Sequence, residues 1–403
     1  MLLYLPTTVS MQTQTLMLSF DNTENAFAYK SDKELRKSNF LFKLINNNTL
    51  VSIGTRLTPL AFKLHLPINS IVKSTIFDHF CGGENLNESL LVIDKLSKFN
   101  VRTILDYGVE GKQSDKDFDH AVEEFLKAIK FAGGNKNVPF LSLKITGIAR
   151  LTLLEKIAAA KILSDAETVE WNRVKGRMHR ICKCAFDNGK SMMIDAEETW
   201  IQQPVDDLVE EMSRSYNKDR AVVYNTIQHY RTDSLQLLKI FAARAKAGNY
   251  LLGIKLVRGA YMEKERARAA KLKYPSPIHS DKSGTDKDYN AGVEFCLQNI
   301  NDISVCVASH NENSNMLAAN FLIDKQLPHD HPHVHFSQLL GMSDHITFNL
   351  ANAGFNVTKY VPYGPVKDVV PYLMRRAQEN TSVSGQMGRE LSLLKKEMVR
   401  RKK

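Results

Sequence analysis

The sequence predicts an α/β fold: a distorted (β/α)8 TIM barrel with an N-terminal helical arm and a helical insertion after the second strand. Eight short runs rich in β-branched and apolar residues follow one another between residues 101 and 361, and helical patterns separate them. Strands that alternate with helices form a parallel sheet, and eight such units favour closure into a barrel. An open doubly wound sheet is the alternative, but no Gly-x-Gly-x-x-Gly follows the first run to cradle a dinucleotide.

Residues 1–99 are predicted to be a helical segment that packs on the barrel. An amphipathic helix spans Asn87 to Phe99, after a turn at Gly82 and Gly83. The first residues lack the basic stretch of a signal peptide, and no apolar run is long enough to span a bilayer. We therefore expect a cytoplasmic protein.

The barrel itself is expected over residues 100–387. Its strands are predicted at Val101–Asp106, Val138–Thr146, Ser191–Glu197, Ala221–Gln228, Leu251–Val257, Ile303–Ser309, His333–Ser337 and Phe355–Val361. Ser114 or Asp115 caps the first helix between strands, and Asn188-Gly189 and Gly248-Asn249 end two later helices. The connection 151–187 is long enough for two or more helices, so it is predicted to be an insertion rather than a domain.

The composition fits one large barrel. The chain has 403 residues, of which 43% are hydrophobic, and this excludes disorder. Its five cysteines, an odd number without zinc-finger or thioredoxin spacing, indicate reduced thiols in a cytosol-like compartment. The net charge of +10 is spread along the chain without a nucleic-acid-binding motif, so no nucleic acid partner is expected. A non-catalytic basic binding protein is the alternative of a different class, and only the charge favours it.

Residues 388–403 are predicted to form a basic C-terminal tail. From Gly388 onward, seven Lys or Arg stand against two Glu, and five apolar residues lie among them. Such a segment can rest on anionic lipid, which would make the protein peripheral at the inner membrane. A solvated terminal helix is the alternative.

The histidine-rich loop 329–335 raises the question of a metal. His333 and His335 share a face if the loop is a strand, and they could then bind one. Pro332 interrupts the run, and no third ligand is near in sequence. We therefore interpret this stretch as a loop leading into the seventh strand, and no metal is expected.

Polar residues gather at the predicted strand ends, which meet at one face of a barrel. They are Asp106, Glu110, Lys144, Thr146, Asp195, Glu197, Gln228, Lys255, Arg258, Ser309, His310, Asn311, Gln338, Tyr360 and Tyr363. Each alone is explained by structure, since a buried lysine, for example, needs a carboxylate partner. So many on one rim exceed that requirement and indicate a functional site.

The helix after the last strand carries two adjacent arginines, Arg375 and Arg376, with Glu379 one turn further on. Guanidinium groups bind carboxylates in bidentate geometry, so this helix is a candidate for holding a small acid. A solvated helix face is the structural alternative.

Together these motifs resemble the proline dehydrogenase family. The matching segments fall in order over residues 82–380: Leu143–Thr146, Ile194–Glu197, Thr226–Tyr230, Ile254–Tyr261, Ala308–Asn311, Gln338–Met342, Tyr360–Gly364 and Tyr372–Asn380. Each is weak alone, but eight in this order are a specific signal.

The resemblance implies a barrel that binds FAD non-covalently and oxidises L-proline to Δ1-pyrroline-5-carboxylate, with a membrane quinone as the electron acceptor. It implies catalytic roles for Asp195 and Lys255. Substrate contacts are implied for Lys144, Tyr360, Arg375, Arg376, Glu379, Glu110 and Leu339. Cofactor contacts are implied for Gln228, Arg258, Gly259, Ala260, Ala196, Ser309 and His310.

The resemblance also bears on specificity. Glu110 matches the position that closes over bound substrate by pairing with Arg375. Tyr360 matches a position near the ring carbon that carries the hydroxyl of hydroxyproline, which favours proline as the substrate. Dehydrogenation of hydroxyproline or a related cyclic imino acid is the alternative.

This chain departs from the large bifunctional bacterial members at two positions. Those members have Arg in place of Lys255 and Lys in place of Arg258. The exchange resembles the monofunctional, mitochondrial-type branch, and it leaves open which of the two side chains reaches flavin N5.

Overall fold

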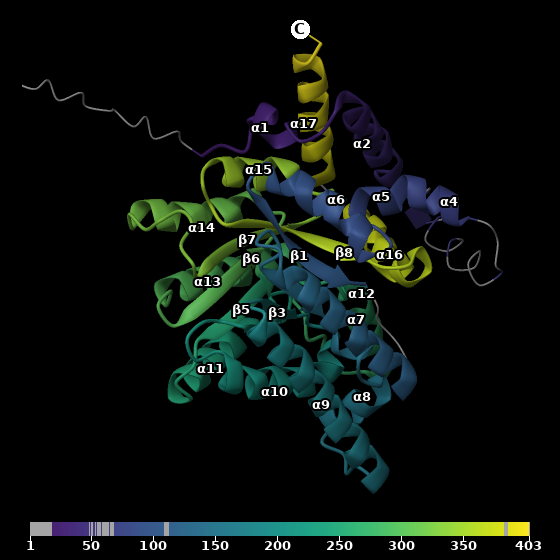
Figure 1. Cartoon of the computed structure of the whole chain (residues 1–403), viewed down its shortest axis with the longest axis vertical. Helices are drawn as coiled ribbons and strands as arrows, with labels where there is room; N and C mark the ends of the chain where they lie inside the picture. Colours follow the sequence, from purple (N-terminus) through teal and green to yellow (C-terminus); the bar gives the residue numbers. More distant parts are fainter. Residues whose placement is uncertain are drawn as a thin grey trace, which may run out of the picture.

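The computed structural model describes residues 18–47, 49, 51, 52, 54, 58, 64, 68–108, 113–382 and 386–402. Eight parallel strands form a closed barrel in chain order, and helices surround it (Figure 1). The first strand pairs with both the second and the last, which closes the sheet and excludes the open doubly wound alternative. The predicted fold class is confirmed.

All eight strands lie where the sequence predicts them. They are β1 Val101–Tyr107, β2 Phe140–Leu143, β3 Ser191–Ile194, β4 Val223–Gln228, β5 Leu252–Val257, β6 Ile303–Ala308, β7 Val334–Leu339 and β8 Val357–Tyr363. The predicted ends differ most from the structure at β2 and β3, which stop three residues earlier than expected. After β2 the chain turns into a short 3-10 helix, η2 (Ile145–Gly147), and the backbone N–H of Thr146 donates to the Glu197 carboxylate instead of a neighbouring strand.

The strands separate two kinds of core. Inside the barrel, alternate residues of the strands form one layer that includes Ile104, Phe140, Met193, Tyr224 and Tyr360. Their neighbours in sequence point outward and pack under the helices, as the period of two requires.

The helices between the strands cover the outside. They are α7 Asp115–Gly133, α8 Leu151–Ala158, α9 Asp165–Asp187, α10 Thr199–Tyr216, α11 Ser234–Ala247, α12 Met262–Leu272, α13 Lys282–Gln298, α14 Glu312–Asp324, α15 Asp344–Asn352 and α16 Val366–Ser382. The insertion predicted after the second strand consists of α8 and α9, at the bottom of Figure 1. Ser114 caps α7, and Asn188 and Gly248 end α9 and α11 as predicted.

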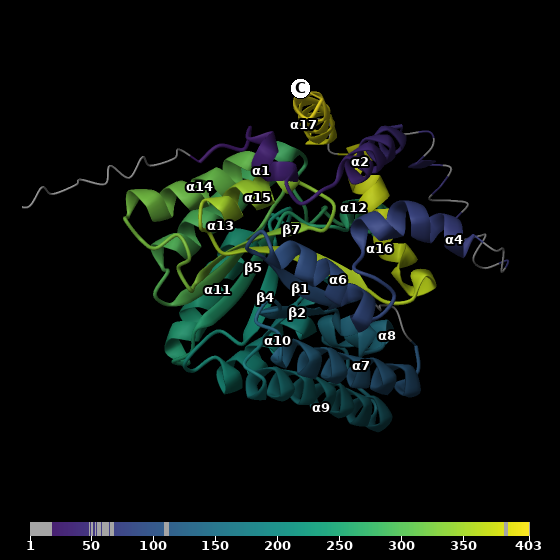
Figure 2. The same ribbon diagram turned by 45° about the horizontal axis from the view of Figure 1, so that its top comes forward.

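An arm of short helices precedes the barrel. Its members are α1 Thr23–Phe27, α2 Asp32–Ile45, α4 Asn69–Val72, the π-helix η1 Lys73–Phe77, α5 Asp78–Phe80 and α6 Leu86–Ser97. The last helix of the chain, α17 (Gln386–Arg400), lies beside α1 and α2, at the opposite end of the molecule from α9 (Figures 1 and 2). The first and the last of the described helices are therefore packed against each other on one side of the barrel.

Helix α17 contains most of the segment predicted as a basic tail, and its apolar side contacts protein. Leu393 and Leu394 are buried in one cluster with residues of the arm, and Leu391 and Met398 pack against it. Two arginines of α17 form ion pairs: Arg389 with Glu312 on α14, and Arg400 with Glu397. The apolar residues that a lipid contact would need are thus largely occupied inside the fold.

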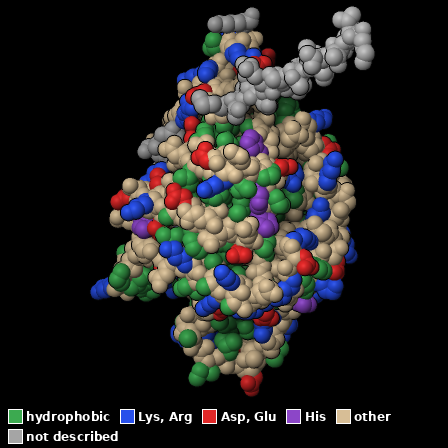
Figure 3. Space-filling view, turned by 90° about the vertical axis from the view of Figure 1, so that its left-hand side faces the viewer, with side chains coloured by type: hydrophobic (Ala, Val, Ile, Leu, Met, Phe, Trp, Pro, Cys, Tyr) green, Lys and Arg blue, Asp and Glu red, His purple; other side chains and the backbone are tan. Residues whose placement is uncertain are grey.

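The surface shows mixed charge. On the face drawn in Figure 3, Lys and Arg side chains are interspersed with Asp and Glu and form no single patch. Within the described segments, no helix is both long enough and apolar enough to cross a bilayer.

The histidine-rich loop leads into β7, as predicted. His335 lies inside the barrel with its ring 4.9 Å from that of Phe140, while His333 donates from Nδ1 to the Ile300 carbonyl at 2.7 Å. The two rings thus have separate roles. All five cysteines are free thiols.

The packing of α17 gives a first test. Replacing the fully buried Leu394 with Ala leaves a cavity in the cluster shared with the arm, so the free energy of unfolding should fall by about 2–5 kcal/mol. Val399→Ala is the control, because Val399 is 58% exposed on the same helix and its loss should cost under about 0.5 kcal/mol. Urea unfolding measures both, and an unchanged stability for Leu394→Ala would mean that α17 is not packed in solution.

Candidate active site

The carboxylate of Asp195 lies at the centre of the barrel mouth, just after β3. It accepts a hydrogen bond from Lys144 Nζ at 3.1 Å, one from Lys255 Nζ, and one from the Tyr360 hydroxyl at 2.9 Å. A fourth donor, Ser142 Oγ, lies 2.7 Å away. These donors come from β5, β8 and the end of β2, so the barrel brings together side chains up to 218 residues apart in sequence.

Two lysines decide the protonation state of Asp195. Burial alone would raise the pKa of this carboxyl, but Lys255 and Lys144 outweigh that effect, and the pKa lies well below its ordinary value. Asp195 is therefore ionised at neutral pH. The lysines are in turn compensated, because an ammonium group so far from solvent needs a partner.

A second carboxylate, Asp106 at the end of β1, lies next to this cluster. Burial raises the pKa of Asp106 to about 6, opposed by Lys144 and reinforced by Asp195. Asp106 also raises the pKa of the Tyr360 hydroxyl, after the larger effect of burial. Asp106 therefore has a higher pKa than Asp195, because Lys144 and Lys255 form ion pairs with Asp195.

The floor of the mouth is aromatic and apolar. Tyr360 lies on β8 with 8% of its surface exposed, and the Lys255 ammonium sits 5.5 Å from its ring centroid. Leu339, at the end of β7, packs at the edge of the same cluster. The mouth thus combines an apolar floor with charged walls, which suits a small ring bearing a charged substituent.

The side of the mouth formed by β5 and β6 holds a fixed guanidinium. Arg258 donates to Asp286 at 2.7 Å, to the Ser309 hydroxyl at 2.6 Å and to the Ser314 hydroxyl at 3.0 Å. Its guanidinium also lies over the Tyr289 ring. These contacts direct Arg258 toward α13 and α14, whereas Lys255, three residues earlier, points into the barrel toward Asp195.

Gln228 joins the ends of β3, β4 and β5. Its side-chain amide donates to the Glu197 carbonyl at 2.7 Å and accepts from the Ala260 N–H at 3.3 Å. Gly259 has a φ of +131°, and an added Cβ would lie 2.5 Å from the Tyr230 ring, so only glycine fits there. The Tyr230 ring therefore packs directly on the backbone of Gly259, while Ala260 is exposed and Ala196 is buried.

The helix α16 and the loop after β6 complete the rim. His310 has a pKa well below the ordinary value because of burial and the nearby charges of Lys359 and Arg376. Arg376 is 7% exposed, and its guanidinium lies 5.3 Å from the Tyr372 ring centroid. Arg375 lies 5.9 Å from the ring of Tyr261, which follows β5. Both arginines therefore come to the mouth rather than to a free helix face.

Two predicted site residues cannot be located. Glu110 lies outside the described residues, and so does the side chain of Glu379, although its backbone belongs to α16. Of the remaining fourteen, twelve lie in or just after the ends of the strands that surround the mouth, and Arg375 and Arg376 lie on α16. Sequence reasoning missed Ser142, which could have been found because it shares a strand face with Lys144, and it gave no role to Asp106.

The donor set fits a flavin dinucleotide. Amide, hydroxyl, imidazole and guanidinium groups line one arc of the rim, from Gln228 through Arg258 and Ser309 to His310. A cation, Lys255, lies between this arc and Asp195, where it would face both a cofactor and a substrate.

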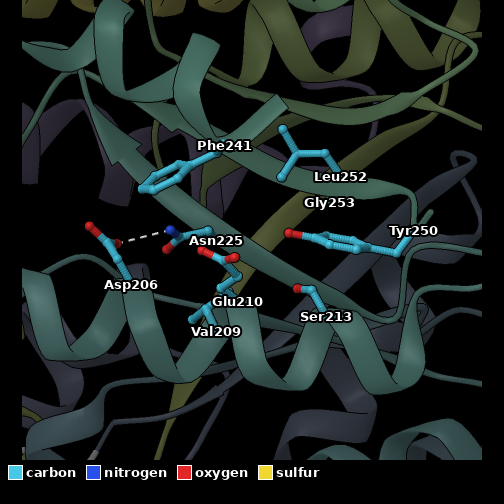
Figure 4. Close-up of a pocket in the computed structure, with 9 residues that line it drawn as sticks. All are labelled: Asp206, Val209, Glu210, Ser213, Asn225, Phe241, Tyr250, Leu252 and Gly253. Carbon is cyan, nitrogen blue, oxygen red and sulfur yellow. Dashed lines mark hydrogen bonds between the residues drawn. The ribbon is translucent and has the colours of Figure 1, made fainter. Parts of the chain in front are cut away.

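Another hollow lies outside the barrel. It is small, lined by α10, α11 and the start of β5, and contains Asp206, which accepts from Asn225 at 2.9 Å (Figure 4). Burial raises the pKa of Asp206 to about 6. The described residues that line this hollow include Asp206 and Glu210 but no Lys or Arg, unlike the barrel mouth.

Comparison with known proteins gives a consistent family. Residues 90–389 match the family model described as Proline dehydrogenase. Proline dehydrogenase 1, mitochondrial, of Dictyostelium discoideum is 30% identical over 94% of this chain and 74% of its own length. Carbapenem antibiotics biosynthesis protein CarD of Pectobacterium carotovorum subsp. carotovorum is 35% identical over 82% of this chain and 85% of its own length.

A solved structure has the same fold. Proline utilization A (PutA) from Bdellovibrio bacteriovorus matches with a TM-score of 0.71 and 20% identity. The match covers 90% of this chain but 38% of that chain, so it concerns one part of a longer protein.

The buried Glu197 gives a test of the site's electrostatics. Burial raises the pKa of Glu197 to about 7, so between pH 4.5 and 7 the folded protein keeps a proton that the unfolded chain has lost, and stability falls as pH rises. Glu197→Gln removes this titration. The natural protein should therefore lose about 2 kcal/mol of unfolding free energy between pH 5 and pH 8 that the Glu197→Gln variant does not lose.

Urea unfolding at the two pH values measures this difference. Glu294→Gln, on the exposed side of α13, is the control and should change stability by less than about 0.5 kcal/mol at either pH. A pH-independent difference for Glu197→Gln would show that Glu197 is ionised in the folded protein at pH 5.

Proposed function

The chain belongs to the proline dehydrogenase family, and on that premise we propose that it oxidises L-proline to Δ1-pyrroline-5-carboxylate. The observation that carries the proposal is the charge arrangement around Asp195. One ionised carboxylate holds two lysines at the mouth, beside a buried tyrosine and two arginines from α16. An excess of cations over an apolar floor is what a small cyclic amino acid needs for its carboxylate and its ring.

Lys144, Arg375 and Arg376 are the proposed partners of the proline carboxylate. Three cations around one carboxylate fix its position, and their repulsion of a fourth charge disfavours an ammonium on the ring nitrogen. A neutral amine is required because the hydride leaves the neighbouring carbon only when the nitrogen lone pair is free. Glu110 is proposed to close over the bound substrate by pairing with Arg375, and Glu379 is proposed to contact the substrate.

FAD is the proposed cofactor, and when bound it would accept the hydride that leaves the substrate, and with it both electrons. Gln228, Arg258, Gly259, Ala260, Ala196, Ser309 and His310 would hold it. Lys255 is the better candidate for the flavin N5 side, because Arg258 is tied to Asp286 and two serines while Lys255 points into the mouth. Asp195 would fix the Lys255 ammonium and the Tyr360 hydroxyl in place, so both Asp195 and Lys255 keep catalytic roles in the proposal.

A quinone is the proposed final acceptor, which requires the protein to meet a membrane surface. We propose that the protein is cytoplasmic and peripheral at the inner membrane. Since the apolar side of α17 packs on the arm, any lipid contact would use other residues.

Arg376 provides a test of substrate binding. Arg376→Met should raise KM for proline at least about tenfold, since a charged hydrogen bond contributes about 1.5–3 kcal/mol, while flavin absorbance of the purified protein stays unchanged. Lys367→Met, an exposed position on the same helix, is the control and should leave KM as it is. Steady-state kinetics decide, and an unchanged KM with lost flavin would remove Arg376 from the substrate site.

Tyr360 provides a test of substrate choice. The natural protein should turn over proline far faster than hydroxyproline, because the Tyr360 ring fills the floor and its hydroxyl is already bonded to Asp195. Tyr360→Ala should raise KM for proline and reduce the ratio of kcat/KM values for the two substrates at least about tenfold. A natural protein that prefers hydroxyproline would support the alternative dehydrogenase.

A further inference from the structure

The loop after β7 is held by an unusual set of buried charges. Lys359 on β8 is fully buried and bonds the Asp344 carboxylate at 2.9 Å, and Lys30 between α1 and α2 bonds the same carboxylate at 2.8 Å. The Tyr29 hydroxyl donates to it at 2.7 Å. Lys359 also donates to the backbone carbonyls of Leu339 and Met342. The loop between β7 and α15 is thus fixed from the arm by Lys30 and from the outer face of β8 by Lys359.

Glu390 on α17 fixes the same loop from the other end of the chain. Its Oε2 accepts a hydrogen bond from the backbone N–H of Ser343 at 3.1 Å, and only 4% of Glu390 is exposed. Within the described part of the chain, Oε1 of this carboxylate is buried without a hydrogen-bond partner. A buried polar atom without a partner is costly, so a residue that carries one is expected to have a specific role.

Ser343 connects Glu390 to the mouth. It has a φ of +51° in the left-handed region, which is unfavourable for a residue with a side chain, so its backbone needs outside support. Its hydroxyl lies 3.0 Å from Nδ1 of His310. A bond to one ring nitrogen of a neutral histidine sets the tautomer and orientation of the ring, and thereby what the other nitrogen presents.

We propose that Glu390 is a positioning residue for the flavin, acting through the Ser343 N–H and hydroxyl on the His310 imidazole. The inference rests on the proposed function, in which His310 contacts FAD. It makes cofactor retention depend on one carboxylate of α17, at residue 390, just beyond the family match at residues 90–389. Loss of the Glu390 acceptor would let Ser343 relax, and the imidazole would lose its fixed orientation.

The test compares FAD binding by full-length variants, from the fluorescence of FAD released on dilution of the holoprotein. Glu390→Ala should raise the dissociation constant of FAD at least about tenfold. Glu390→Gln should stay within about twofold of the natural protein, because its amide oxygen can accept from Ser343 in the same way. Leu394→Ala changes a buried apolar residue of α17 that cannot accept the Ser343 hydrogen bond, so it should lower thermal stability while leaving the dissociation constant within about twofold.

Equal FAD affinity in Glu390→Ala and the natural protein would overturn the inference, and so would an equal loss in Leu394→Ala. If Glu390→Ala does not fold, Ser343→Gly decides, because glycine keeps the left-handed backbone and removes only the hydroxyl that contacts His310. That variant should show the same loss, and unchanged affinity would contradict the proposal. A natural protein that binds no FAD would instead refute the proposed function.

Discussion

The ion pairs of Asp195 with Lys144 and Lys255 are the interaction on which the rest of the site depends. Two ammonium groups inside a barrel mouth would be expensive without a carboxylate between them, and one carboxylate alone would be equally so. Together they are stable and still leave positive charge for a substrate. The same carboxylate accepts a hydrogen bond from the Tyr360 hydroxyl. Asp195 therefore fixes both the two lysines of the mouth and the tyrosine that forms its floor.

Barrel closure is what makes this arrangement possible. Lys144, Asp195 and Lys255 each come directly from the region of a different strand end, and parallel strands bring those ends to one rim. The arm and α17 pack together outside β7 and β8. There, Lys30 and Glu390 support the loop between β7 and α15, which contacts His310. Buried polar contacts thus connect the barrel mouth to the arm and α17. Such contacts require a defined geometry, because a buried polar group without a hydrogen-bond partner is costly.

Much of the fold and part of the site follow from local sequence. The strand positions were predictable because the period of β-branched residues and the turn residues are local signals, and the rim residues followed from barrel geometry. The early ends of β2 and β3 were not predictable, because the Thr146 N–H bonds a side chain 51 residues away. The amphipathic pattern of α17 was visible, but only the tertiary structure decides whether Leu394 faces lipid, solvent or protein. Nor does any local signal pair Lys30 with Asp344, or Glu390 with Ser343.

The central claim is that the cations around Asp195 hold proline against a bound flavin. The most direct measurement is the visible flavin absorption of the purified protein, recorded without oxygen before and after addition of L-proline. We expect a yellow protein whose absorption band is lost on mixing with proline. A colourless protein, or a band that proline leaves unchanged, would contradict the claim.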